Sequence, residues 1–134
     1  MTGKACRPTR AIKCSAPGGG ATFYYLGLNV QVPALADKRV RQAFAYALDR
    51  QRLVDIALAG FGRPRSIPWP EQSLAYAATL DQTYTYDPDH ARQLLNAATW
   101  NADTLLPINI PNGIDVTNQL AQIIQANLAD VWLA

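Results

Sequence analysis

Residues 37–52 read DKRVRQAFAYALDRQR, and this stretch decides the local fold around it. Its apolar side chains recur at helical spacing and form one stripe: Val40, Phe44, Ala47 and Leu48. Asp37 and Asp49 each precede a helical segment, and an aspartate there can accept hydrogen bonds from the free N–H groups of the first turn. The stretch therefore predicts two consecutive short helices, and Gly60 is a natural end for the second.

The same stretch carries five basic side chains: Lys38, Arg39, Arg41, Arg50 and Arg52. A helix that reads nucleic acid should present such residues along one face, but at about 100° per residue Arg39 and Arg50 diverge from the other three. No aromatic residues interleave with them as stacking platforms for single strands. A solvated helix surface with internal ion pairs is favoured, and a small independent basic domain that binds nucleic acid is the alternative.

Composition places the chain among ordinary globular proteins. Its 134 residues are 49% apolar and 16% charged, with a net charge of +2. The charge is uneven: residues 1–65 hold eleven Lys/Arg and three Asp/Glu, a charge of +8, whereas residues 66–134 hold one Arg and seven acids, a charge of −6. Such a split is typical of partner surfaces or of a divided domain. No apolar run approaches the roughly 20 residues that span a bilayer, so no membrane insertion by this chain is expected.

Working outward from residues 37–52, the pattern predicts alternating strands and helices. Residues 21–31 and 105–110 are rich in β-favouring side chains and are predicted strands. Asp87 and Pro88 begin a helix that continues to Ala98, and the last helix has one apolar face: Val116, Leu120, Ile123, Ile124, Leu128 and Val131. Residues 61–86 form a long connection.

The order strand, helix, helix, loop, helix, strand, helix indicates an α/β fold. Two strands make a poor sheet, so the sheet is expected to be incomplete and the sequence to be cut from something larger. Residues 1–20 are expected to be an irregular tail without a recognisable signal peptide, and residues 21–134 the folded part. Cys6 and Cys14 lie in the tail, where they can pair after export or remain thiols in a reducing compartment.

Little in the sequence suggests catalysis. His90 is the only histidine, and no G-x-S-x-G motif surrounds Ser15, Ser66 or Ser73, which disfavours a small hydrolase. Cys, His and carboxylate residues show no metal-ligand spacing, and the GGG run lacks the Lys of a phosphate loop. We therefore expect no enzyme activity, no metal and no cofactor.

The long connection is the best candidate for a binding site. It contains the aromatic residues Trp69, Tyr76, Tyr84 and Tyr86, and the charged residues Arg63, Arg65 and Glu71 flank Trp69. Long loops in compact domains are often functional, and Trp and Tyr combine large apolar area with a polar group. The alternative is that these aromatic rings cover the edge of the core. Trp69, Tyr76 and Ser66 are the predicted ligand-binding residues.

Taken together, these segments resemble the extracellular solute-binding proteins of family 5, the peptide- and nickel-binding subunits of ABC importers. The resemblance rests on YYLGLNVQVPALADKRVRQAFAYALDR, then GFGRP, then YTYDPDHARQLLNAA, and covers roughly residues 22–131. The matching positions are Asn29, Asp37, Val40, Arg41, Ala43, Asp49, Arg50, Gly60, Gly62, Pro64, Tyr86, Asp87, Pro88, Ala91, Leu94 and Leu95.

The resemblance implies part of the C-terminal lobe of a protein with the type II fold of periplasmic binding proteins. Such proteins close two lobes on a peptide or similar solute and deliver it to an ABC permease, with no enzymatic step. It also implies a periplasmic or extracellular location, association with the membrane through the transporter, and a structural role for residues 37–50 rather than contact with nucleic acid. The chain departs from the family pattern at His90, where a basic residue is usual, and at Thr99, where many members have Gly.

Overall fold

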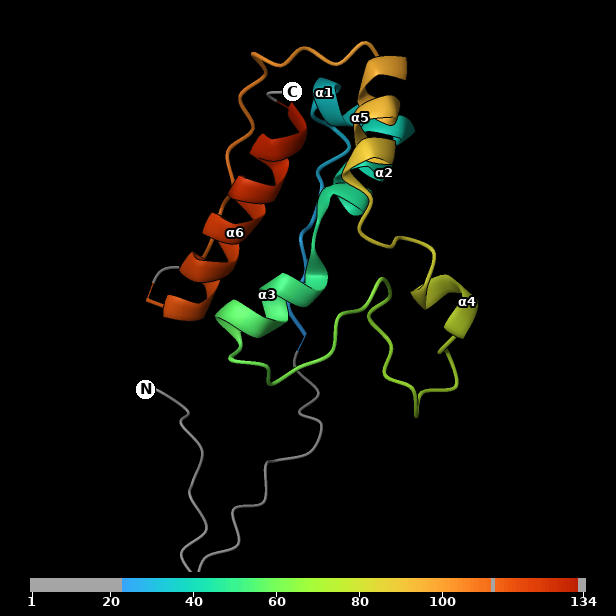
Figure 1. The fold of residues 1–134 in the computed structure, drawn as a ribbon, viewed down its shortest axis with the longest axis vertical. Coiled ribbons are helices and arrows are strands. Elements are labelled where there is room, and N and C mark those ends of the chain that lie inside the picture. The colour runs from blue at the N-terminus through green and yellow to red at the C-terminus, as the bar shows by residue number, and fades with distance from the viewer. Residues whose placement is uncertain (1–22, 112, 133–134) are drawn as a thin grey trace, which may run out of the picture.

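The computed structural model describes residues 23–111 and 113–132, and its regular structure there is helical. The helices are α1 (Pro33–Ala36), α2 (Lys38–Ala47), α3 (Arg50–Ala57), α4 (Ala78–Asp81), α5 (Pro88–Ala97) and α6 (Asp115–Trp132). Figure 1 shows α6 along one side of the molecule, α4 on the opposite side, and α2 and α5 between them. The four longer helices confirm the predicted ones, whereas the single turns α1 and α4 were not predicted.

The core forms where α2, α5 and α6 meet. Most of its enclosed side chains come from the predicted apolar stripes: Val40, Phe44, Ala47, Ala91, Leu95, Leu128 and Val131. Leu35 and Ala43 complete the buried cluster and were not among the residues of the predicted stripes. The Phe44 ring meets the edges of two tryptophans, with centroid distances of 6.5 Å to Trp100 and 5.2 Å to Trp132. Burial of these groups supplies the main driving force for this part of the fold.

Aspartates begin three of the helices, as the sequence predicts. The Asp37 carboxylate accepts from the Arg39 N–H at 2.8 Å, Asp49 from Arg52 at 3.0 Å, and Asp87 from His90 at 2.9 Å. Each bond satisfies an N–H group that has no partner within the helix. The predicted end of α3 is also confirmed: Gly60 has a φ of 79°, and its N–H donates to the Val54 carbonyl at 3.0 Å.

Thr99 ends α5 in a backbone conformation that glycine prefers. Its φ is 50°, and the next N–H, that of Trp100, turns back to the Leu95 carbonyl at 3.0 Å. A β-branched side chain in this left-handed region is strained. The departure from the family pattern at Thr99 therefore falls where the backbone requires a positive φ.

The α/β class stays a prediction. Residues 23–29 and 104–111, which overlap the predicted strands, form no helix, and neither is paired with another strand within the described residues. Leu26, Leu28 and Leu106 nevertheless pack against the helical core. Much of the rest of these two segments is exposed, including Tyr25 and Leu105. The predicted division at residue 20 lies outside the described residues, as do Cys6 and Cys14.

Asn127 lies on the inward face of α6 and is 2% exposed. With the amide oriented to satisfy both of its ends, the oxygen accepts from the Asp49 N–H at 3.0 Å and the nitrogen donates to the Ile123 carbonyl at 2.9 Å. One buried side chain therefore joins α6 to the junction between α2 and α3. This role was not predicted from the sequence, although buried polar side chains generally have hydrogen-bond partners.

Candidate functional site

Three of the five basic residues in 37–52 donate hydrogen bonds to main-chain carbonyls of the same chain. Arg41 Nη1 donates to the carbonyls of Leu35 at 2.9 Å and Ala36 at 2.7 Å, at the end of α1. Arg39 Nη1 donates to the Ala97 carbonyl at 2.5 Å, where α5 ends. The last carbonyls of a helix have no hydrogen-bond partner within the helix, and this end carries a partial negative charge. A guanidinium group donates hydrogen bonds to these carbonyls and its positive charge is attracted to the same end.

Arg50 makes a similar contact and also reaches the long connection. Its Nη1 lies 3.0 Å from the Ala45 carbonyl in α2 and 3.0 Å from the Tyr84 carbonyl near the end of that connection. Burial lowers the pKa of Arg50, and the charge of Asp81 opposes this effect. With Arg39, Arg41 and Arg50 committed to main-chain carbonyls, the geometry favours the structural interpretation of this stretch over a nucleic-acid surface.

Residues 61–86, which we call the aromatic loop, are organised by charge rather than by an apolar core. None of these residues is buried, although Arg65 and Asp81 are largely enclosed, with side chains 19% and 11% exposed. Arg65 Nη1 contacts Asp81 Oδ2 at 2.7 Å, and Arg65 Nη2 contacts Glu71 Oε1 at 2.8 Å. One guanidinium therefore connects two distant parts of the loop.

Further hydrogen bonds converge on Asp81. The Ser66 N–H donates to Asp81 Oδ1 at 2.9 Å, and the Tyr76 hydroxyl donates to Asp81 Oδ2 at 3.3 Å. The Tyr76 ring also lies beneath the Arg65 guanidinium, 5.3 Å from its carbon to the ring centroid, as in a cation–π contact. We call Arg65, Glu71, Asp81, Ser66 and Tyr76 the loop clamp.

The charges of the clamp stabilise each other. The hydrogen bond from Arg65 lowers the pKa of Glu71, and the charge of Arg63 lowers it further. Burial raises the pKa of Asp81, but the hydrogen bonds from Ser66 and Arg65 outweigh burial and leave that pKa below its ordinary value. The pKa of Arg65 is raised, chiefly by its hydrogen bond to Glu71. All three groups are therefore held in their charged forms.

The three predicted ligand-binding residues fall in different situations. Ser66 and Tyr76 belong to the loop clamp: the Tyr76 hydroxyl donates to Asp81, whereas Ser66 donates its backbone N–H to Asp81 and its hydroxyl to the Tyr84 carbonyl at 3.4 Å. Half of the Trp69 surface, 50%, is exposed. The structure thus separates one exposed aromatic residue from two residues that shape the loop around it. The partnership of Arg65 with Asp81 was not predicted, because no local pattern links residues 16 positions apart.

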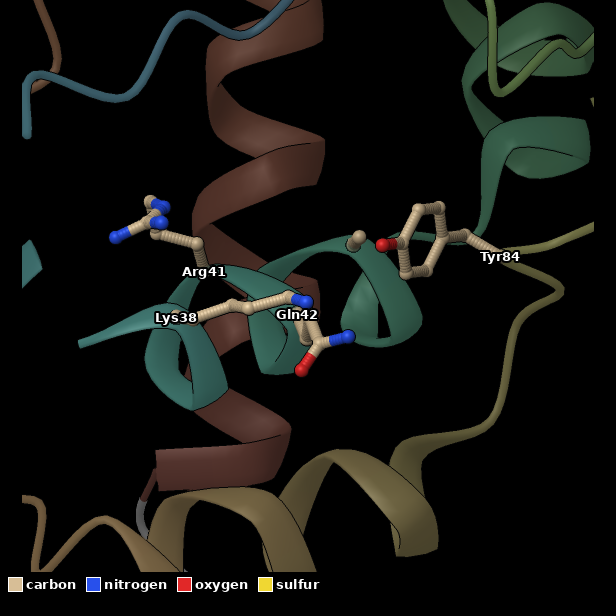
Figure 2. A pocket seen from close by; sticks show the side chains of 5 residues that line it. Lys38, Arg41, Gln42 and Tyr84 are labelled. Atoms are coloured by element: carbon tan, nitrogen blue, oxygen red, sulfur yellow. The ribbon is translucent and has the colours of Figure 1, made fainter. Parts of the chain in front are cut away.

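A shallow hollow lies beside the aromatic loop, on the outer face of α2. Figure 2 shows Lys38 and Gln42 on α2 and Tyr84 from the end of the loop. Ala45 also lines the hollow. Arg41 also lines it, although its guanidinium points away from Tyr84. The polar residues that line the hollow are hydrogen-bond donors or amides, and no carboxylate lines it.

His90 has a packing role in this structure. Its ring meets the Tyr46 ring edge-on at a centroid distance of 4.6 Å, where α5 contacts α2. Within residues 23–111 and 113–132, no group of three Cys, His, Asp or Glu side chains gathers as a metal ion would require. None of the helices in that part of the chain has the length and apolar character to cross a membrane.

The chain belongs to the bacterial extracellular solute-binding proteins of family 5. The model of the middle region of that family matches residues 11–131, which is most of the sequence. This finding confirms the resemblance drawn from the sequence motifs.

Curated relatives agree with the family. An ABC transporter peptide-binding protein of Brucella ovis is 37% identical over 120 residues, which cover 87% of this chain and 22% of the relative. The glutathione-binding protein GsiB of Salmonella choleraesuis is 32% identical over 109 residues, covering 81% of this chain and 21% of the relative. The chain spans about a fifth of the length of these relatives. No solved structure matches it.

Proposed function

We propose that this chain contributes part of the C-terminal lobe of the solute-binding component of an ABC importer for peptides or similar solutes. The single observation that carries the proposal is the family match over residues 11–131, and the names of the relatives supply the solute class. The proposed protein works in the periplasm or outside the cell, delivers its solute to a permease, and performs no chemical reaction. The expected α/β fold belongs to the same proposal.

The aromatic loop is the proposed solute contact within this chain. Trp69 is half exposed on a loop whose shape is held by the clamp, and a large amphipathic ring on a preorganised loop is suited to a peptide. The exposed ring retains its indole N–H for a backbone carbonyl of the solute. Tyr76 then acts on the loop rather than on the solute, since its hydroxyl donates to Asp81. Ser66 serves the loop as well, because its backbone N–H donates to Asp81 and its hydroxyl donates to the Tyr84 carbonyl at 3.4 Å.

The test is peptide affinity, measured by calorimetry, of the complete binding protein that contains this chain. Tri- to pentapeptides and glutathione are the probes. Trp69→Ala should weaken binding about tenfold or more, because central aromatic residues carry much of the energy of such interfaces. Ile56→Ala is the matched control: Ile56 is a similarly exposed apolar residue, 55%, outside the loop.

Two results would count against the proposal. Equal affinity of Trp69→Ala and Ile56→Ala would remove the loop from the binding site. Absence of binding to every peptide and to glutathione would remove the proposed solute class. The chain of residues 1–134 by itself should bind these probes weakly or not at all, because solute held between two lobes loses the contacts of the other lobe and cannot be enclosed.

A further inference from the structure

Arg65 and Asp81 are the two residues that make most of the contacts of the loop clamp, and Arg65 is the one that links it to Glu71. Arg65 reaches Glu71 on one side and Asp81 on the other, with contacts of 2.8 and 2.7 Å, and its guanidinium covers the Tyr76 ring. The partners follow it by 6, 16 and 11 positions in the sequence. Three separate parts of the aromatic loop therefore meet at this side chain.

The neighbouring Arg63 provides a natural comparison. It contacts the same carboxylate oxygen, Glu71 Oε1, at 3.0 Å, but its side chain is 72% exposed and has no second carboxylate partner within the described residues. Exposed ion pairs contribute little, because water screens them and long side chains lose freedom. Arg65 is 19% exposed and meets Asp81, which is 11% exposed, so its pair is better shielded from water.

In the sequence, Trp69 lies between Arg65 and Glu71, which contact each other in the clamp. Arg65 and Ser66 precede it, and Glu71 follows it by two residues, so the contacts of Arg65 with Glu71 close a short loop around Trp69. The bond from the Ser66 N–H to Asp81 fixes the start of that loop against α4. Few other contacts can do this, since no residue from 61 to 86 is buried.

We propose that Arg65 is the positioning residue of the solute site: it holds the aromatic loop in the shape that presents Trp69, without contacting the solute. This inference rests on the proposed function for the identity of the site, but the state of the loop is measured without any solute. Tyr76 and Ser66 serve the same arrangement through Asp81. Loss of Arg65 leaves Glu71 with only the exposed Arg63 and leaves Asp81 without its ion pair, so the link between these two parts of the loop is lost.

The first measurement is hydrogen–deuterium exchange of the chain, resolved to peptides covering residues 66–81, α2 and α5. Arg65→Met keeps most of the side-chain stem and removes the charge and the donors. It should speed exchange in residues 66–81 about tenfold, with α2 and α5 unchanged, because local opening needs only the loop contacts to be lost. Arg63→Met should change exchange there by less than about twofold. Arg65→Lys restores the charge without the two-sided geometry and should lie between these variants.

Equal exchange in Arg65→Met and Arg63→Met would overturn the inference. Faster exchange in α2 and α5 to the same degree as in the loop would also overturn it, because that result describes a general loss of stability. The second measurement is the peptide affinity of the complete protein, where Arg65→Met should weaken binding about as much as Trp69→Ala does. A loosened loop with unchanged affinity would refute the positioning role. No binding by the wild-type protein would refute the proposed function and leave the exchange result to decide the state of the loop.

Discussion

The helical core and the aromatic loop are stabilised by different physical means. In the core, apolar side chains of α2, α5 and α6 are almost fully enclosed, with Ala91 at 0% and Ala47 at 1% exposure. Between residues 61 and 86 no side chain is buried, and a cluster of charges around Arg65 takes the place of a core. Apolar burial responds weakly to pH, whereas an ion-paired network depends on charge. We therefore expect that the aromatic loop can be altered by substitution or by pH while the helical core stays folded.

The largest expected effect tests the scaffold. Phe44 is 5% exposed and lies against Trp100 and Trp132. Phe44→Ala should lower the free energy of unfolding by about 3–5 kcal/mol, because it removes a buried ring and leaves a cavity. Urea unfolding followed by circular dichroism measures the change. The exposed-residue control Ile56→Ala should cost about 0.5 kcal/mol or less, and a similar cost for both variants would show that the described core does not carry the stability.

A smaller effect tests the polar connection within the scaffold. Asn127→Ala should cost about 1–3 kcal/mol, because the Asp49 N–H loses its acceptor while the site stays enclosed. Gln125→Ala on the same helix is the control, since Gln125 is exposed. Thermal unfolding of the two variants in parallel gives the difference. Equal midpoints would mean that Asn127 does not join α6 to the junction of α2 and α3.

A substitution at the end of α5, Thr99→Gly, should raise the free energy of unfolding by about 0.5–1 kcal/mol. Thr99 has a φ of 50°, a region that costs β-branched residues energy and glycine very little. Thr99→Gly should therefore raise the unfolding midpoint, while Thr99→Val should not. A fall in the midpoint of Thr99→Gly would show that the strain at this position is smaller than the flexibility that glycine adds to the unfolded chain.

Acid should separate the two regions. Glu71 and Asp81 have lowered pKa values, so their contribution is fully present above their ordinary values of 4.5 and 3.8 and is lost as pH falls through the lower folded values. Amide NMR spectra recorded from pH 7 downward should show the loop resonances of residues 66–81 shifting below about pH 4. Asp37, which caps α2, also has a lowered pKa because of its hydrogen bonds with Arg39, so the first turn of α2 should shift in the same range. Resonances of the buried residues Phe44 and Leu95 that change together with those of the loop would contradict the separation.

Local patterns predicted much of the scaffold. Apolar spacing and the aspartates at positions 37, 49 and 87 placed the four longer helices, because helix formation and capping depend on residues close in sequence. The single turns α1 and α4 gave too short a pattern to detect. Strand pairing could not be established, since residues 23–29 and 104–111 have the composition of strands but a ladder requires a neighbour.

The candidate site was only partly predictable. Aromatic content and loop length pointed to residues 61–86, but they could not separate the exposed Trp69 from the engaged Tyr76 and Ser66. That separation depends on Asp81, which lies far from Arg65 and Ser66 in the sequence and becomes their partner only through the path of the loop. Long-range ion pairs of this kind carry no local sequence signal.

The most direct test of the account is hydrogen–deuterium exchange of the complete binding protein with and without a saturating peptide. Within this chain, bound peptide should slow amide exchange most strongly in residues 61–86, around Trp69, while exchange in α2, α5 and α6 should change little. Added protection confined to the helices or to other parts of the protein, with residues 61–86 unchanged, would contradict the claim that the aromatic loop contacts the solute.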